Sequence, residues 1–141
     1  MSRRYRLTRS ALDNLDAKLK NYRDIENTIN RRKYEIENDK KVYENIGGGR
    51  ANKISKPVED IVIKWFEDSQ LQSLYAFKNA VERTIADLND ENMKIFTMRW
   101  LDPNQLTWRE ICETLHWGKS TVYRRREIIL ELFDKHSGEL G

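Results

Sequence analysis

The residues with the clearest chemistry lie between Thr107 and Arg126, where two short helical patterns flank a turn. The second pattern, which begins near Gly118, is rich in cationic and hydrogen-bonding side chains: Lys119, Ser120, Thr121, Tyr123, Arg124, Arg125 and Arg126. Ammonium and guanidinium groups bind phosphates, and a guanidinium also matches the two acceptors on the edge of guanine. The pattern therefore predicts a helix-turn-helix whose second helix enters the major groove of double-stranded DNA.

The cationic residues of this second helix are expected to divide into two roles. If Val122 and Ile129 point into the core, Arg124 faces outward, and we expect it to contact a guanine. Phosphate contacts, which give affinity without sequence information, are expected from Lys119, Arg125 and Arg126. Arg125 falls where an aliphatic residue usually packs, so either its side chain snorkels to the surface or the helix is rotated.

The first helix of the motif has its own signals. Thr107 with Glu110 three residues later forms a capping box, and Ile111, Cys112 and Leu115 have the spacing of one buried helical face. We expect Thr107 and Trp108, at the helix start, to hold a phosphate. His116 occupies the turn position where glycine is common, and histidine tolerates a left-handed backbone better than most residues.

Composition favours an all-α protein of one domain or one domain with a helical appendage. Of the 141 residues, 35% are charged and 38% hydrophobic, and both prolines lie outside the periodic segments. One cysteine, Cys112, cannot form an internal disulfide, which favours a reducing cytoplasm; its role is that of a small core residue or, alternatively, a reactive thiol. No apolar run is long enough for a membrane span, and no apolar stretch follows the basic start as in a secretion signal.

The formal net charge of +3 hides an uneven distribution along the chain. Residues 1–56 hold 15 Lys/Arg against 8 Asp/Glu (net +7), residues 57–91 hold 3 against 8 (net −5), and residues 92–141 hold 8 against 7 (net +1). Two cationic regions around an acidic one suggest an anionic partner that is contacted at two places.

The chain divides into four expected segments: 1–44, a basic N-terminal helix; 45–57, a glycine-rich connector; 58–88, an acidic helical segment; and 89–135, the helix-turn-helix domain. The first helix is expected from residue 8 to about 40, capped by Thr8 or Ser10. It carries an apolar residue every seven positions, namely Leu15, Tyr22, Ile29, Ile36 and Tyr43. Such a helix lies against another helix, either in the same chain or in a second copy as a homodimer.

The connector contains three consecutive glycines, which are too costly for a helix interior. It is read as a flexible link or, alternatively, as a segment that contacts the DNA backbone through Arg50, Lys53 and Lys56. Pro57 fits the first turn of the following helix, the apolar phase slips over 67–70, and Asn89 or Asp90 can cap the next helix. We expect the acidic segment to form an antiparallel hairpin with the basic first helix.

No arrangement of residues indicates catalysis. His116 and His136 are the only histidines, and neither has a second ligand at metal spacing. With no nucleophile-base pair and no phosphate loop, the sequence predicts a protein that is not an enzyme and has no metal and no cofactor.

The segment Leu88-Asn-Asp-Glu-Asn-Met-Lys-Ile-Phe-Thr-Met-Arg-Trp100, with the following motif from Thr107 to Arg126, resembles the DNA-reading C-terminal region of bacterial sigma factors. Together with Asn45-Ile-Gly-Gly-Gly-Arg-Ala-Asn-Lys-Ile-Ser-Lys-Pro57, it is similar to the RinA family of phage transcriptional regulators over roughly residues 45–135. The resemblance implies an activator of late or packaging genes in phages and prophages of Gram-positive bacteria, nucleoid-associated when bound, with host RNA polymerase as a further partner.

Two other functions remain open. Small terminase-like DNA-recognition subunits of phage packaging machines also join helix-turn-helix units to helical oligomerisation segments. A structural coiled-coil adaptor whose terminal motif no longer binds DNA is the second alternative.

Overall fold

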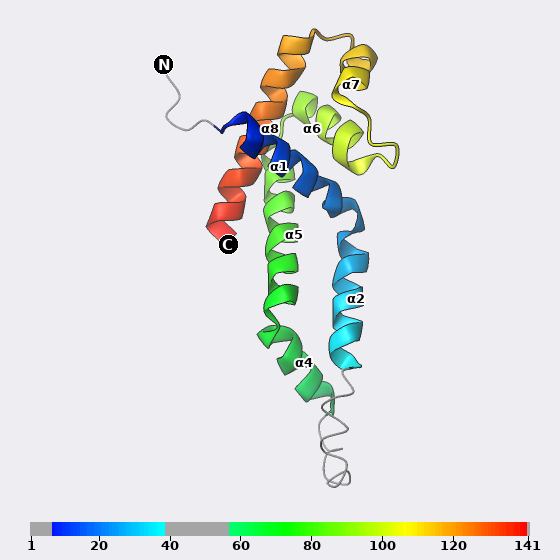
Figure 1. Cartoon of the computed structure of the whole chain (residues 1–141), viewed down its shortest axis with the longest axis vertical. Helices are drawn as coiled ribbons and strands as arrows, with labels where there is room; N and C mark the ends of the chain where they lie inside the picture. The colour runs from blue at the N-terminus through cyan, green and yellow to red at the C-terminus, as the bar shows by residue number, and fades with distance from the viewer. Residues whose placement is uncertain (1–6, 39–56, 141) are drawn as a thin grey trace. The chain divides into compact units, whose positions relative to one another are not determined.

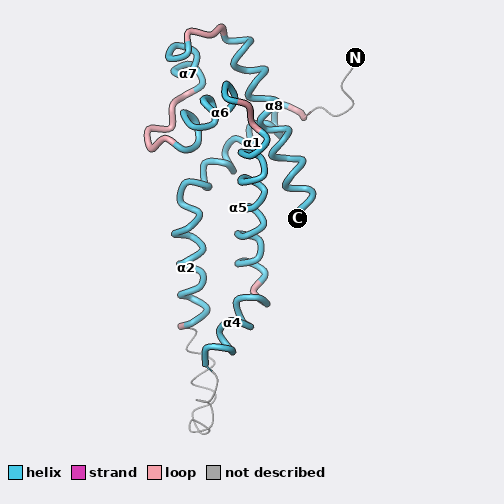
Figure 2. Tube along the Cα trace, turned by 180° about the vertical axis from the view of Figure 1, so that it is seen from behind, coloured by secondary structure: helices cyan, strands magenta, loops and turns pink. Residues whose placement is uncertain are grey.

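The structure, a computed structural model, describes residues 7–38 and 57–140, and these are helical apart from short turns (Figures 1 and 2). No strand occurs in these two ranges, so the predicted all-α class is confirmed. The α-helices are α1 (Arg9–Leu19), α2 (Ile25–Glu37), α4 (Pro57–Glu67), α5 (Ser69–Asp87), α6 (Asp90–Phe96), α7 (Trp108–Leu115) and α8 (Lys119–Leu140). A 3₁₀ segment, η1 (Lys20–Asp24), follows α1, and a π-helical turn, η3 (Thr97–Leu101), follows α6.

The helices belong to two compact units that differ from the four segments expected from the sequence. The first unit contains residues 1–24 and 76–141, and the second contains residues 25–75, with α5 crossing the boundary. The predicted N-terminal helix is therefore shared between the two units. Its first part packs in the same unit as α7 and α8.

The core of the first unit is built from apolar residues of α1 and of the helices from α5 onward. Phe96, Trp100 and Phe133 are its largest fully buried side chains, and they make ring contacts such as Phe77–Phe133 at 5.9 Å and Phe96–Trp100 at 5.2 Å between centroids. The other buried apolar members are Leu12, Leu19, Ala80, Val81, Ile95, Ile111, Val122, Ile129 and Leu130. Ring pairs of this kind stabilise a core beyond their buried area.

The single helix expected over residues 8–40 is interrupted, and this expectation is corrected. Thr8 caps α1 as predicted, since its hydroxyl accepts a hydrogen bond from the amide of Ala11 at 3.1 Å. Leu19 and Ile25 are both buried, but six residues on a continuous α-helix would place them about 120° apart. The 3₁₀ segment between them changes the phase, and the two residues then belong to different units. Tyr43 lies outside the described residues.

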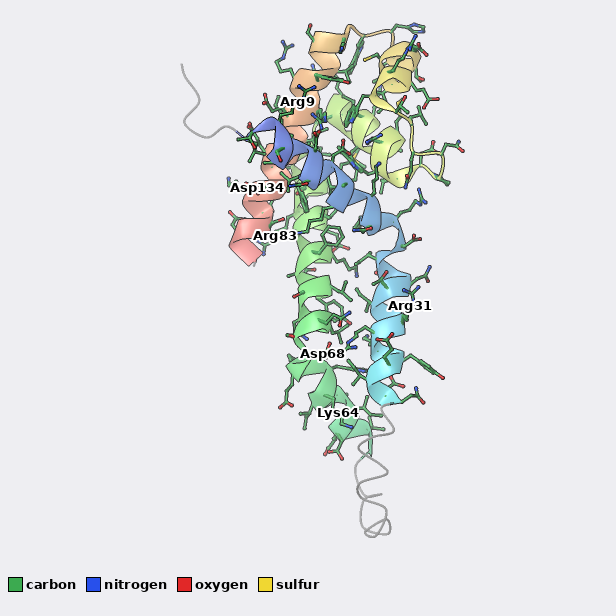
Figure 3. All side chains as sticks on the ribbon, in the orientation of Figure 1. Arg9, Arg31, Lys64, Asp68, Arg83 and Asp134 are labelled. Atoms are coloured by element: carbon green, nitrogen blue, oxygen red, sulfur yellow. The ribbon has the colours of Figure 1, made fainter. Side chains whose placement is uncertain are left out.

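The second unit is held by an ion pair between Arg32 of α2 and Asp68. Asp68, which is labelled in Figure 3, is the residue between α4 and α5. The guanidinium donates from Nε to Oδ2 at 2.9 Å and from Nη2 to Oδ1 at 2.6 Å, a bidentate arrangement. These bonds lower the pKa of Asp68, and the amide of Leu71 adds a hydrogen bond at 2.7 Å. The break expected over residues 67–70 is confirmed, since α4 ends at Glu67 and α5 begins at Ser69. Of the expected hairpin, this unit contains the contact of the basic α2 with α4 and Asp68.

The same unit contains a cation-π contact. The ammonium of Lys33 lies 4.7 Å from the ring centroid of Trp65. Pro57 begins α4 as predicted. Arg50, Lys53, Lys56 and the rest of the segment 45–56 lie outside the described residues.

Candidate nucleic-acid interface

The helices α7 and α8 are joined by a turn whose local geometry matches the prediction. The amide of Glu110 donates to the Thr107 hydroxyl at 3.1 Å, and the Thr107 amide donates to the Glu110 carboxylate at 2.8 Å, which completes the capping box. His116 ends α7 in the left-handed conformation with φ 58° and ψ 37°. A left-handed residue turns the chain sharply after a helix, and α8 begins three residues later.

The N-terminal half of α8 presents one polar and one buried side. Val122 and Ile129 are completely buried, as predicted. Lys119, Ser120, Tyr123 and Arg124 are exposed, and Thr121 is half-buried. The exposed set therefore offers an ammonium, a guanidinium and two hydroxyl groups on the surface of one helix.

Arg125 does not share this exposed surface. Its Nη2 lies 2.7 Å from a carboxylate oxygen of Glu91, its Nη1 donates to Asn92 at 3.1 Å, and its guanidinium lies over the Trp117 ring. Both acceptors come from α6, so the side chain crosses the α6–α8 contact and keeps 24% of its surface exposed. Its expected phosphate contact stays a prediction, and it would compete with the ion pair to Glu91.

Arg126 is also engaged inside the protein, with a side chain only 12% exposed. Its Nη2 lies 3.0 Å from Asp13 and 3.5 Å from Asp16, both on α1, and the guanidinium lies over the rings of Trp108 and Tyr123. Two carboxylates already meet this charge, so the expected phosphate contact of Arg126 is corrected. The reason is tertiary: α1 covers this side of α8.

Asp16 is the most connected side chain of the site, and sequence reasoning missed it. Its carboxylate is 7% exposed and accepts hydrogen bonds from Arg99 Nε at 3.1 Å, Trp100 Nε1 at 3.0 Å and Trp108 Nε1 at 2.9 Å. Arg99 Nη2 adds a further bond at 3.2 Å. The available signal was a carboxylate within the apolar stripe of α1, between Leu12 and Leu19.

The remaining predicted residues lie at the start of α7. Thr107 is exposed, and its hydroxyl serves the capping box. The half-buried Trp108 ring packs edge-on against Trp100 at 5.6 Å, so its side chain supports the core. Arg109, which the sequence reasoning did not include, is 89% exposed, with Glu113 as its ion-pair partner at 3.4 Å.

Other kinds of site are not found in the described ranges. They contain no group of three or more His, Cys, Asp or Glu side chains that is suited to a metal ion. None of the helices described is both long and apolar enough to cross a bilayer. Cys112 is a half-buried free thiol.

Fold and site together define an all-α protein in which a capped helix, a left-handed turn and a long helix present a small cationic surface. The chain belongs to the family described as protein of unknown function (DUF722), whose profile matches residues 11–135. No curated protein and no solved structure matches the chain.

Proposed function

We propose that the protein is a sequence-specific DNA-binding transcriptional regulator that reads the major groove with the first turns of α8. One observation carries the proposal. Lys119, Ser120, Tyr123 and Arg124 remain exposed, while Val122 and Ile129 on the other side of the helix are completely buried. A helix that is anchored on one side and carries hydrogen-bonding cations on the other suits groove recognition.

The exposed residues suggest distinct roles. Arg124 is the base-reading residue, because a guanidinium can donate two parallel hydrogen bonds to a guanine. Lys119 supplies a point charge for a phosphate. The backbone amides at the start of α7, where Thr107 is the N-cap, provide a second phosphate contact, and Arg109 stands one residue further on.

The particular kind of regulator is inferred from sequence resemblance. The triple-glycine segment and the terminal motif are similar to the RinA family, and the motif resembles the DNA-reading region of sigma factors. We therefore propose an activator of late or packaging genes of a phage or prophage, acting in the bacterial cytoplasm, with host RNA polymerase as a second partner.

Selection of bound fragments from the source genome tests the proposal. The full chain is incubated with sheared duplex DNA, bound fragments are sequenced, and their affinity is measured over a range of salt concentrations. We expect one enriched site close to a promoter. Loss of enrichment is expected for the double variant Lys119→Ala/Arg124→Ala.

A matched control is Lys135→Ala, which removes an exposed lysine near the other end of the same helix. This variant should retain the enrichment. Absence of any enriched site, or equal binding by the double variant, would contradict the proposal. Enrichment at a packaging start would instead assign the protein to DNA packaging.

A further inference from the structure

Helix α4 carries apolar side chains on two sides. Ile61 and Trp65, four residues apart, are half-buried, and Trp65 lies beneath Lys33 of α2. A second set points to solvent, with exposed fractions of 71% for Val58, 39% for Val62, 51% for Ile63 and 74% for Phe66. We call these four residues the outer face of α4.

The outer face is a patch and not a scatter of single residues. Val58, Val62 and Phe66 repeat every four residues, and with Ile63 they span an arc of about 140° around the helix. Seven large apolar side chains are exposed in the described residues, and four of them lie on this one helix of 11 residues. An exposed apolar arc of this width on a short helix marks an interaction surface.

We propose that the outer face of α4 packs against the outer face of a second copy of this chain, antiparallel and with the two-fold axis beside Val62. The stripe is symmetric about that residue, since Val58 and Phe66 stand four positions to either side. Antiparallel pairing places the large Phe66 of one copy against the small Val58 of the other. Parallel pairing would place the two Phe66 rings against each other at one end and two valines at the other.

The charge within the same arc favours the same orientation. Glu59 is exposed between the positions of Val58 and Ile63. Antiparallel pairing separates the two Glu59 positions by about 9 Å along the helix axis, at 1.5 Å per residue. Parallel pairing would bring them to the same level, where like charges repel.

The area of the outer face agrees with what a specific dimer requires. A standard interface buries about 800 Å² per partner, of which about 56–65% is apolar, so roughly 450–520 Å² of apolar surface is needed on each side. From the exposed fractions of its four side chains, the outer face offers roughly 450 Å². Tyr34 of α2, in the same unit and 65% exposed, adds to the apolar surface of that unit.

The first test is the mass of the full chain in solution, without DNA, by light scattering over a range of concentrations. We expect twice the 16.9 kDa of one chain. Val62→Lys should return the mass to that of a monomer with unchanged helix content. Ile128→Lys is a matched control, because Ile128 on α8 is 39% exposed, as Val62 is, and this variant should remain dimeric.

The second test uses the symmetry of the proposed contact. Residue 62 of one chain contacts residue 62 of the second chain only if the two-fold axis passes beside it. Val62→Cys in a Cys112→Ser background should therefore form a disulfide-linked dimer on mild oxidation, whereas Ile128→Cys in the same background should not.

Two results would overturn the proposal. A wild-type chain that is monomeric at all concentrations would show that no second copy binds. A dimer that persists in Val62→Lys and gives no disulfide through residue 62 would assign the contact to another surface. Neither of these results depends on DNA binding, so the proposed function is tested separately.

Discussion

At the scale of single residues, Arg124 and Arg126 show how position around a helix decides the use of a charge. Residues two positions apart on an α-helix differ by about 200° around the helix axis. The side chains of Arg124 and Arg126 therefore leave α8 on nearly opposite sides. Arg124 is exposed. Arg126 lies over two aromatic rings and meets Asp13 and Asp16. The guanidinium of Arg124 is thus accessible to a ligand, whereas that of Arg126 stabilises the fold.

The proposed roles of Arg124 and Lys119 predict different effects of replacement. Arg124→Ala should reduce the preference for the cognate site over other sequences by about 10-fold or more, since a bidentate base contact is worth about 1–3 kcal/mol. Lys119→Ala should weaken binding to all sequences alike and reduce the slope of affinity against salt by about one unit. Fluorescence anisotropy with cognate and scrambled duplexes measures both. Identical effects of the two variants would contradict the division of roles.

Asp16 predicts a large effect on stability. Asp16→Asn keeps the shape of the side chain and one acceptor, but leaves the guanidinium of Arg99, which is 12% exposed, without its counter-ion. Removal of one partner from a buried ion pair costs about 3–5 kcal/mol, and we expect a loss in the free energy of unfolding near that range in urea denaturation.

Asp13→Asn serves as the control for Asp16→Asn. Asp13 also pairs with Arg126, but its side chain is 66% exposed, and exposed pairs contribute about 0–1 kcal/mol. Equal losses for the two variants would show that the buried carboxylate has no special role.

At the scale of elements, the end of α8 is fastened to α5 by His136. Its Nε2 lies 2.7 Å from a carboxylate oxygen of Asp87, and its Nδ1 lies 2.9 Å from Glu139. Glu139 in turn lies 3.9 Å from the guanidinium of Arg83 on α5. The hydrogen bond to Asp87 is the main reason that the pKa of His136 is raised above its usual 6.5, with a further contribution from Glu139 and an opposing one from burial.

A raised pKa predicts the direction in which this contact depends on pH. The folded state binds the proton more tightly, so the contribution of His136 to stability is complete below about pH 6.5 and is lost as the pH rises through the folded-state pKa. The difference in unfolding free energy between wild type and His136→Gln should therefore shrink as the pH rises above about 6.5. In an Asp87→Asn background this pH dependence should largely disappear. If the difference between wild type and His136→Gln increased with pH, the predicted direction of the pH dependence would be wrong.

At the scale of the whole molecule, the division into two units joins α1 to the proposed DNA-binding helices and separates it from α2. Leu19 is completely buried in the first unit, and Ile29 is 2% exposed in the second. The N-terminal helix thus packs within its own chain, and its first part forms one core with α8.

This division predicts which substitutions change the unfolding of the first unit, as followed by the fluorescence of its tryptophans. Trp65 is the only tryptophan of the second unit, so in a Trp65→Phe background fluorescence follows Trp100, Trp108 and Trp117 alone. There, Leu19→Ala should lower the free energy of unfolding by about 2–5 kcal/mol. Ile29→Ala should cause a smaller decrease in the free energy of unfolding that this fluorescence reports. Equal shifts would show that the two units unfold as one.

The sequence by itself determined the features that depend on near neighbours. The cap at Thr8, the capping box from Thr107 to Glu110, the left-handed His116 and the break at Asp68 all follow from contacts within a few residues. The buried side of α8 followed from the 3.6-residue period, which is a property of one helix.

Tertiary structure decided which charges remain available to a partner. The sequence placed Arg125 and Arg126 with the other cations of α8, because nothing local shows that Glu91 and Asn92 of α6, or Asp13 and Asp16 of α1, face them. These contacts join residues 33 to 113 positions apart. Pairing at such separations depends on how helices pack against each other, and the periodicity of a single helix does not contain that information.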